Sequence, residues 1–163
     1  MRRESTFGVV YNRQHNLSYL ASLIAAAIPL LDPNFVQKDA LALQTHFRKK
    51  RNFMVKELRK LDIKVKSPEA TFYLWADVSE LPPPLNSGTI FFEYCVRHKV
   101  IVVPGIFFDV NPKHRRKYVH SPFHDHLRMS FGPSWDNLKL AIKGMSEVIE
   151  LAKKGQLKPL SDY

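Results

Sequence analysis

The residue with the clearest chemical potential is Arg128, which stands in the middle of the stretch 126–132. Apolar and polar residues alternate over this stretch, and a period of two predicts a strand with one face on a core. A guanidinium on a rigid strand suits bidentate binding of a carboxylate or phosphate, because its planar fork presents several N–H donors. The alternative is an ordinary solvated arginine on a half-buried strand, because charged residues on strands mostly face water.

A second group of polar residues lies just before this arginine. His120, His124 and His126 are close together, with Asp125 between the last two. Neutral imidazoles bind zinc, and His124 and His126 would share one face of an extended strand. Pro122 interrupts the segment, and no cysteine or fourth ligand has motif spacing. We therefore predict no metal site.

The composition is that of a globular domain. The chain has 163 residues, of which 45% are hydrophobic, enough to bury a core without disulfides. The single cysteine, Cys95, excludes an internal disulfide and is expected to be a small core hydrophobe. No run of 18 apolar residues occurs, so we expect no membrane span and a cytoplasmic location.

The net charge of +10 is concentrated on one segment. Residues 36–60 carry eight basic and two acidic side chains, an excess of six positive charges. A run of this kind is usually the solvated face of a helix, and no nucleic-acid-binding motif accompanies it. We therefore expect no nucleic-acid partner; a stand-alone basic module that binds nucleic acid is the alternative function.

The pattern of apolar residues and breakers predicts a small set of elements. Helices are predicted over 17–28, about 33–61, 89–98 and from Ser134 to about Gly155, and strands over 63–66, 71–78, 100–103 and 126–132. The long helix should bury one apolar stripe: Val36, Ala40, Leu43, Phe47, Met54, Leu58 and Leu61. The fold class is α/β of the two-layer α+β type, a small sheet of short strands packed against three to four helices. Residues 106–125 form a long loop with a basic cluster at 113–117, and 156–163 a tail.

Four segments in this order resemble the C-terminal small domain of class I/II aminotransferases, the fold type I enzymes that depend on pyridoxal phosphate. They are Phe72–Asp77, Val102–Gly105 with Phe107–Asp109, Leu127–Gly132, and an amphipathic final helix. The resemblance runs from about Ile28 to Leu151. It implies a small domain over 28–155, preceded by a large-domain remnant or leading helix at 1–27 and followed by the tail 156–163.

The resemblance also implies a site. In this family the arginine of the last strand clamps the α-carboxylate of the substrate, and Arg128 matches it. Pro104 and Gly105 match a Pro-Gly pair near the substrate pocket. Phe72 and Tyr73 match an aromatic strand start near the same pocket, with Ala70 where the family often has glycine.

The family's cofactor chemistry needs a Schiff-base lysine, an acid for the pyridine nitrogen and donors for the phosphate. No Ser-x-x-Lys followed by Pro-Gly-x-Arg-x-Gly occurs here. The resemblance therefore implies no catalytic residue in this chain, no tightly bound pyridoxal phosphate, and an inactive isolated chain. The complete enzyme would add the missing large domain, form a homodimer, and transfer an amino group between an amino acid and a 2-oxo acid. A non-catalytic partner subunit is the further alternative.

Overall fold

The computed structural model describes residues 20–110 and 121–160. The chain divides into two compact units, the first ending at Thr45 and the second beginning at His46. The predicted boundary between residues 1–27, a large-domain remnant or leading helix, and the small domain over 28–155 concerns the complete enzyme and stays a prediction. The basic cluster 113–117 and His120 lie outside the described residues.

The described part of the first unit is helical. It holds a helix over Leu20–Leu30 and the first half of α2, which spans Pro33–Lys60. The Asp32 carboxylate accepts a hydrogen bond from the Asn34 backbone N–H (3.0 Å), as expected of the helix start at Asp32-Pro33. No single helix in the described ranges has the length and apolarity to cross a membrane; this helix and α2 together meet that test but are bent by 90°.

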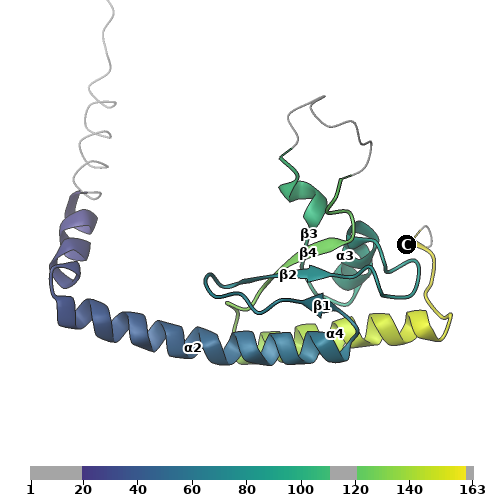
Figure 1. Ribbon diagram of the computed structural model, residues 1–163, viewed down its shortest axis with the longest axis horizontal. Helices are drawn as coiled ribbons and strands as arrows, with labels where there is room; N and C mark the ends of the chain where they lie inside the picture. The colour runs from purple at the N-terminus through teal and green to yellow at the C-terminus, as the bar shows by residue number, and fades with distance from the viewer. Residues whose placement is uncertain (1–19, 111–120, 161–163) are drawn as a thin grey trace, which may run out of the picture. The chain divides into compact units, whose positions relative to one another are not determined.

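The second unit is built on a four-stranded antiparallel sheet with the order β1-β2-β4-β3 (Figure 1). The strands are β1 (Lys64–Val65), β2 (Tyr73–Asp77), β3 (Val103–Pro104) and β4 (His126–Ser130). The two central strands, β2 and β4, pair over their whole length, with Trp75 opposite Arg128. The small antiparallel sheet with helices confirms the predicted fold class.

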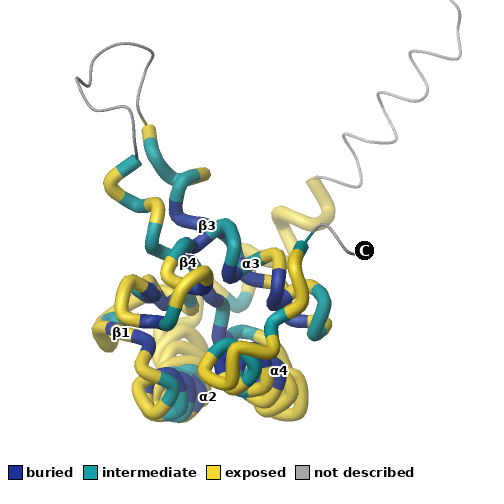
Figure 2. Tube along the Cα trace, turned by 90° about the vertical axis from the view of Figure 1, so that its right-hand side faces the viewer, coloured by how far each residue is buried: buried dark blue, intermediate teal, exposed yellow. Residues whose placement is uncertain are grey.

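One face of the sheet is covered by helices. The second half of α2 and α4 (Trp135–Lys153) lie side by side beneath the strands in both views (Figures 1 and 2). In β2 and β4 every second residue is buried on this side, as the alternation predicted for β4: Leu74, Ala76, Leu127 and Met129. They share one apolar core with Met54 and Leu58 of α2 and with Leu138, Met145 and Ile149 of α4.

The predicted buried stripe of the long helix is correct only in part. Met54 and Leu58 are buried, but Val36 and Leu43 are 39% and 48% exposed. Burial begins where the sheet covers α2, so helical periodicity alone did not show where along the helix a partner lies.

The prediction for the strand 100–103 is wrong in two respects. Only Val103–Pro104 pairs with β4, and Ile101 is 84% exposed rather than covered on both faces. Residues 100–102 lie outside the sheet, and β3 is an edge strand, where one side of the backbone has no strand partner in the described sheet. An edge strand tolerates Pro104, because the N–H that proline lacks would be needed only in a central strand.

The remaining elements follow the predictions closely. Helix α3 (Gly88–Arg97) packs on α4 and β3, and buries Phe91, Tyr94 and Cys95. The Ser134 hydroxyl caps α4 by accepting from the Asn137 N–H. The described part of the predicted tail is attached to α3: Tyr94 donates to the Lys158 carbonyl and Arg97 to the Leu160 carbonyl, each at 2.9 Å.

Candidate functional site

The open face of the sheet, opposite the helices, gathers the polar and aromatic side chains of β2 and β4. Tyr73, Trp75 and Asp77 alternate with the buried residues of β2, and His126, Arg128 and Ser130 do so in β4. All of these except Ser130 line a depression of about 700 Å³, which Lys64 and Lys66 also line. The period of two that predicted β4 therefore also puts the polar side chains of this strand on the face that forms the candidate site.

Arg128 lies between two aromatic rings. Its guanidinium carbon is 4.4 Å from the centre of the Tyr73 ring and 4.6 Å from that of the Phe108 ring. Tyr73 comes from β2, and Phe108 from the short helix η1 (Gly105–Phe108) that follows β3. Contacts of this kind attract the cation to the ring faces.

The N–H donors of Arg128 have no acceptor in the part of the chain that the structure describes. Among the described residues, none accepts a hydrogen bond from Arg128 and no carboxylate pairs with it. By contrast, Arg51 donates to the Pro68 carbonyl and Arg59 to the Val65 carbonyl. Arg128 is thus half-buried, fixed by rings and able to donate to an acceptor from outside.

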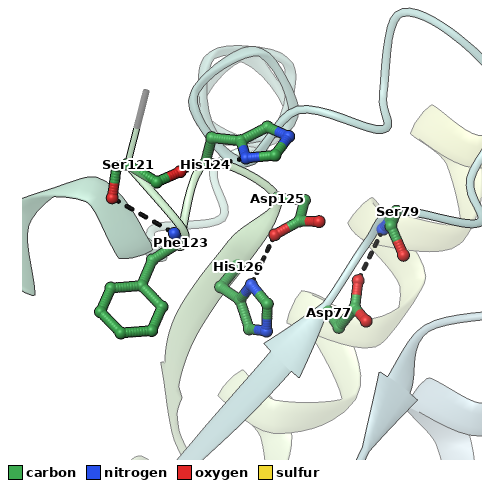
Figure 3. Close-up of polar contacts among 7 residues, drawn as sticks. All are labelled: Asp77, Ser79, Ser121, Phe123, His124, Asp125 and His126. Atoms are coloured by element: carbon green, nitrogen blue, oxygen red, sulfur yellow. Dashed lines mark hydrogen bonds and ion pairs between the residues drawn. The ribbon is translucent and has the colours of Figure 1, made fainter. Parts of the chain in front are cut away.

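The histidine two residues before Arg128 is also fixed. The Nδ1 of His126 is 2.5 Å from the Asp125 carboxylate (Figure 3). The His126 ring stacks on Trp75 with centroids 5.5 Å apart. His124 lies in the preceding turn, with Nδ1 3.2 Å from the Ser121 carbonyl. The segment before β4 is a turn rather than a strand, so His124 and His126 do not share a strand face. The described residues include no cluster of three metal-ligating side chains.

Asp77 faces His126 across the strand pair. Partial burial alone would raise the pKa of this carboxyl, but hydrogen bonds from Ser79, with the nearby His126 and Lys64, lower it below its ordinary value. The Asp77 oxygen accepts from the Ser79 N–H at 2.8 Å (Figure 3). The open face therefore carries an ionised carboxylate two residues along β2 from Trp75.

The other residues predicted for the site are placed as follows. Phe72 lies outside the depression, stacks on Phe47 of α2, and its carbonyl accepts from the Phe131 N–H. Pro104 is buried in β3. Gly105 approaches the chain itself: a Cβ there would lie 2.6 Å from the Phe123 carbonyl oxygen. Of the residues predicted for the site, the structure brings Tyr73 and Arg128 together.

Sequence reasoning missed Trp75, His126 and Phe108 as neighbours of the arginine. For His126 the signal was present, because it lies two residues before Arg128 in the predicted alternating strand and so shares its face. For Trp75 the strand was predicted, but not which of its residues face outward. Phe108 gave no such signal, because a short turn of helix has no long-range period.

Two lysines line the depression, Lys64 and Lys66, and Lys64 is unsuited to form a Schiff base with pyridoxal phosphate. The hydrogen bond from Lys64 to Glu80, 2.8 Å long, raises the pKa of Lys64 above its ordinary value. A Schiff-base lysine instead requires a lowered pKa. Lys66 is exposed at the rim of the depression.

Lys50 corrects a prediction. It was expected on the solvated face of the long helix, but it is only 4% exposed. Its ammonium donates to the carbonyls of Gly132 (3.1 Å) and Pro133 (2.5 Å), directly after β4. Helical position alone did not reveal this, because the acceptors lie more than 80 residues away in the sequence.

Cys95 is a core residue, as expected. Burial raises the pKa of its thiol to about 12, so it does not form the thiolate that a nucleophile needs.

The comparisons with known proteins agree with this architecture. The model of the family "Aminotransferase class I and II" matches residues 11–144. An aromatic aminotransferase from Pyrococcus horikoshii is 20% identical, with a TM-score of 0.63 over 82% of this chain and 31% of that chain.

Two structures of Thermus thermophilus aspartate aminotransferase are also similar. A tetra mutant complexed with tryptophan is 22% identical (TM-score 0.60, 74% of this chain, 27% of that chain). The enzyme with maleate is 23% identical (TM-score 0.57, 71% and 26%). At these identities the likeness shows the fold, and this chain spans less than a third of each of these structures. No curated protein matches. Because the family model covers most of the sequence, the chain belongs to the class I and II aminotransferase family.

Proposed function

We propose that this chain is the C-terminal small domain of an aminotransferase and supplies the arginine that binds the substrate carboxylate. The observation that carries the proposal is Arg128, which is held between Tyr73 and Phe108 with no acceptor in the described chain. Family membership supports the reaction class, the transfer of an amino group between an amino acid and a 2-oxo acid.

In this proposal Arg128 binds and orients the substrate. A carboxylate that approaches the guanidinium edge accepts two parallel N–H bonds, which fix both the position and the plane of the carboxylate group. The reacting α-carbon, one bond away from that group, is thereby placed. Arg128 is therefore a binding residue, and we assign no proton transfer to it.

The chemistry of pyridoxal phosphate, stabilisation of a carbanion, would come from outside this chain. Lys64 is paired with Glu80 and Lys50 with two carbonyls, so we derive no step through the cofactor here. A large domain, a homodimeric complete enzyme and a cytoplasmic location remain parts of the proposal, as does the inactivity of this chain alone.

The basic residues of α2 favour this proposal over a nucleic-acid-binding module. Four of the eight basic side chains in 36–60 already donate to acceptors within the chain: Lys50, Arg51, Arg59 and Lys60. Much of the charge that suggested a binding surface thus stabilises the fold.

The experiment is a titration of the full chain with pyruvate, a small 2-oxo acid, followed by NMR. We expect weak binding, with shifts centred on Arg128 and its neighbours on the open face. R128Q should abolish these shifts. R48Q, which changes an exposed arginine of α2, is the control and should bind as the wild type does. Equal binding by R128Q would contradict the proposal.

A further inference from the structure

We propose that Tyr73 and Phe108 are positioning residues, which hold the Arg128 guanidinium so that only its N–H edge can bind a ligand. The inference rests on the proposed function and adds a selectivity for planar oxyanions over tetrahedral ones. It begins from the two short distances, 4.4 Å and 4.6 Å, between the guanidinium carbon and the ring centres.

The two rings come from opposite sides of β4. Tyr73 belongs to β2, which pairs with β4 along one edge, and Phe108 follows β3, which pairs along the other edge. Val103 of β3 and Trp75 of β2 are both register partners of Arg128. The topology of the sheet therefore places one ring on each side of the arginine.

Each ring is itself held in place. Phe108 makes an edge contact with Trp75, with centroids 5.7 Å apart, and Tyr73 contacts Phe72 at 4.3 Å. The turn that carries Phe108 can reach its position because residue 105 is glycine, where a Cβ would lie 2.6 Å from the Phe123 oxygen. The arrangement is thus built from segments far apart in the sequence.

The chemistry follows from the shape of the two groups. Aromatic faces attract the cation but do not accept its in-plane N–H bonds, so these donors point out along the edge. A carboxylate can lie in the plane of the guanidinium and accept two of them. A tetrahedral oxyanion can also offer two oxygens in that plane, but its remaining substituents project above and below the plane, on the sides where the two rings lie.

The test uses acetate and methanesulfonate, two monoanions with the same methyl group and different geometry. The full chain is titrated with each, with the Arg128 Nε–H signal followed by NMR in the wild type and in F108L. F107L is the matched control, because Phe107 is the adjacent residue and is 72% exposed. Y73F keeps the ring and should bind as the wild type does.

We expect the wild type to bind acetate more tightly than methanesulfonate. F108L should move the Arg128 signal downfield, since one shielding ring is lost, and should weaken acetate binding by roughly fivefold, as for one cation–π contact of ordinary strength. Its affinity for methanesulfonate should fall less, so that the selectivity decreases. F107L should change neither the signal nor the selectivity.

Two failures can be told apart. If the wild type binds acetate but F108L and F107L match it in signal and selectivity, the positioning role is overturned and the proposed function stands. If the wild type binds no acetate at Arg128, the proposed function fails, and the inference fails with it.

Discussion

Asp77 connects a single carboxyl group to the pH dependence of stability. Its pKa is lowered in the folded state: desolvation opposes the shift, and the Ser79 hydrogen bonds, His126 and Lys64 outweigh it. A lowered folded-state pKa means that the folded state binds the proton less well than the unfolded state does. The stabilisation is therefore complete above the ordinary value of 3.8 and is lost as the pH falls through the folded-state value.

We predict that D77N lowers the free energy of unfolding at pH 7 and that this difference vanishes in strong acid. Asparagine can still accept from the Ser79 N–H, so the variant removes the charge and keeps the hydrogen bond. The measurement is urea unfolding of both proteins between pH 2 and pH 7. D39N, an exposed carboxylate of α2, is the control and should show little difference at any pH. A gap between wild type and D77N that persists at pH 2 would contradict the assignment.

At the scale of elements, Lys50 joins α2 to the segment that follows the arginine strand. Its ammonium reaches the carbonyls of Gly132 and Pro133, between the end of β4 and the start of α4. The lysine thus satisfies two carbonyls at a point where the backbone belongs to neither a strand nor a helix. A hydrogen bond from a charged donor such as this ammonium contributes about 1.5–3 kcal/mol to stability.

We predict that K50M lowers the free energy of unfolding by about 1–3 kcal/mol, because methionine keeps the apolar stem and loses the donors. K49M, on the exposed face of the same helix, should stay within about 0.5 kcal/mol of the wild type. Urea denaturation at pH 7 measures both. Equal effects for the two variants would show that the hydrogen bonds of Lys50 do not contribute.

The helices and strands also show which features of the fold and of the candidate site could be predicted from the sequence. Alternation predicted β4, and with it the open face on which Arg128 lies, because pleating fixes sidedness over a few residues. A run rich in β-forming and aromatic residues predicted β2. The burial of Lys50 and the position of Phe108 depend on segments that meet only after folding. The edge position of β3 is of the same kind: an apolar run does not reveal how many neighbours its strand will have. Alternation therefore indicated the outward position of Arg128, whereas Tyr73 was named only through the family resemblance.

At the scale of the whole molecule, the chain spans less than a third of the solved aminotransferases that it resembles. Its open face carries Arg128, which we propose binds the substrate carboxylate, whereas Lys64 is paired with Glu80 and Lys50 with two carbonyls. If the substrate-binding arginine lies on this domain and the Schiff-base lysine on the large domain, catalysis would depend on the assembly of the two domains. The proposed function thus predicts how this chain behaves toward the cofactor when it is alone.

We predict that the chain forms no stoichiometric adduct when it is mixed with one equivalent of pyridoxal phosphate and reduced with borohydride. Protonated surface lysines react poorly, since the neutral amine is the nucleophile, and Lys64 is held protonated by Glu80. Lys50 should remain unmodified, because it is the least exposed lysine described and its ammonium is bonded to two carbonyls. Mass spectrometry of the intact chain and of its peptides gives the result. Scattered modification at low yield agrees with the proposal. A single lysine that carries one full equivalent, together with amino-group transfer to pyruvate, would show that the chain holds its own cofactor site. The proposal that a separate large domain supplies the Schiff-base lysine would then be wrong.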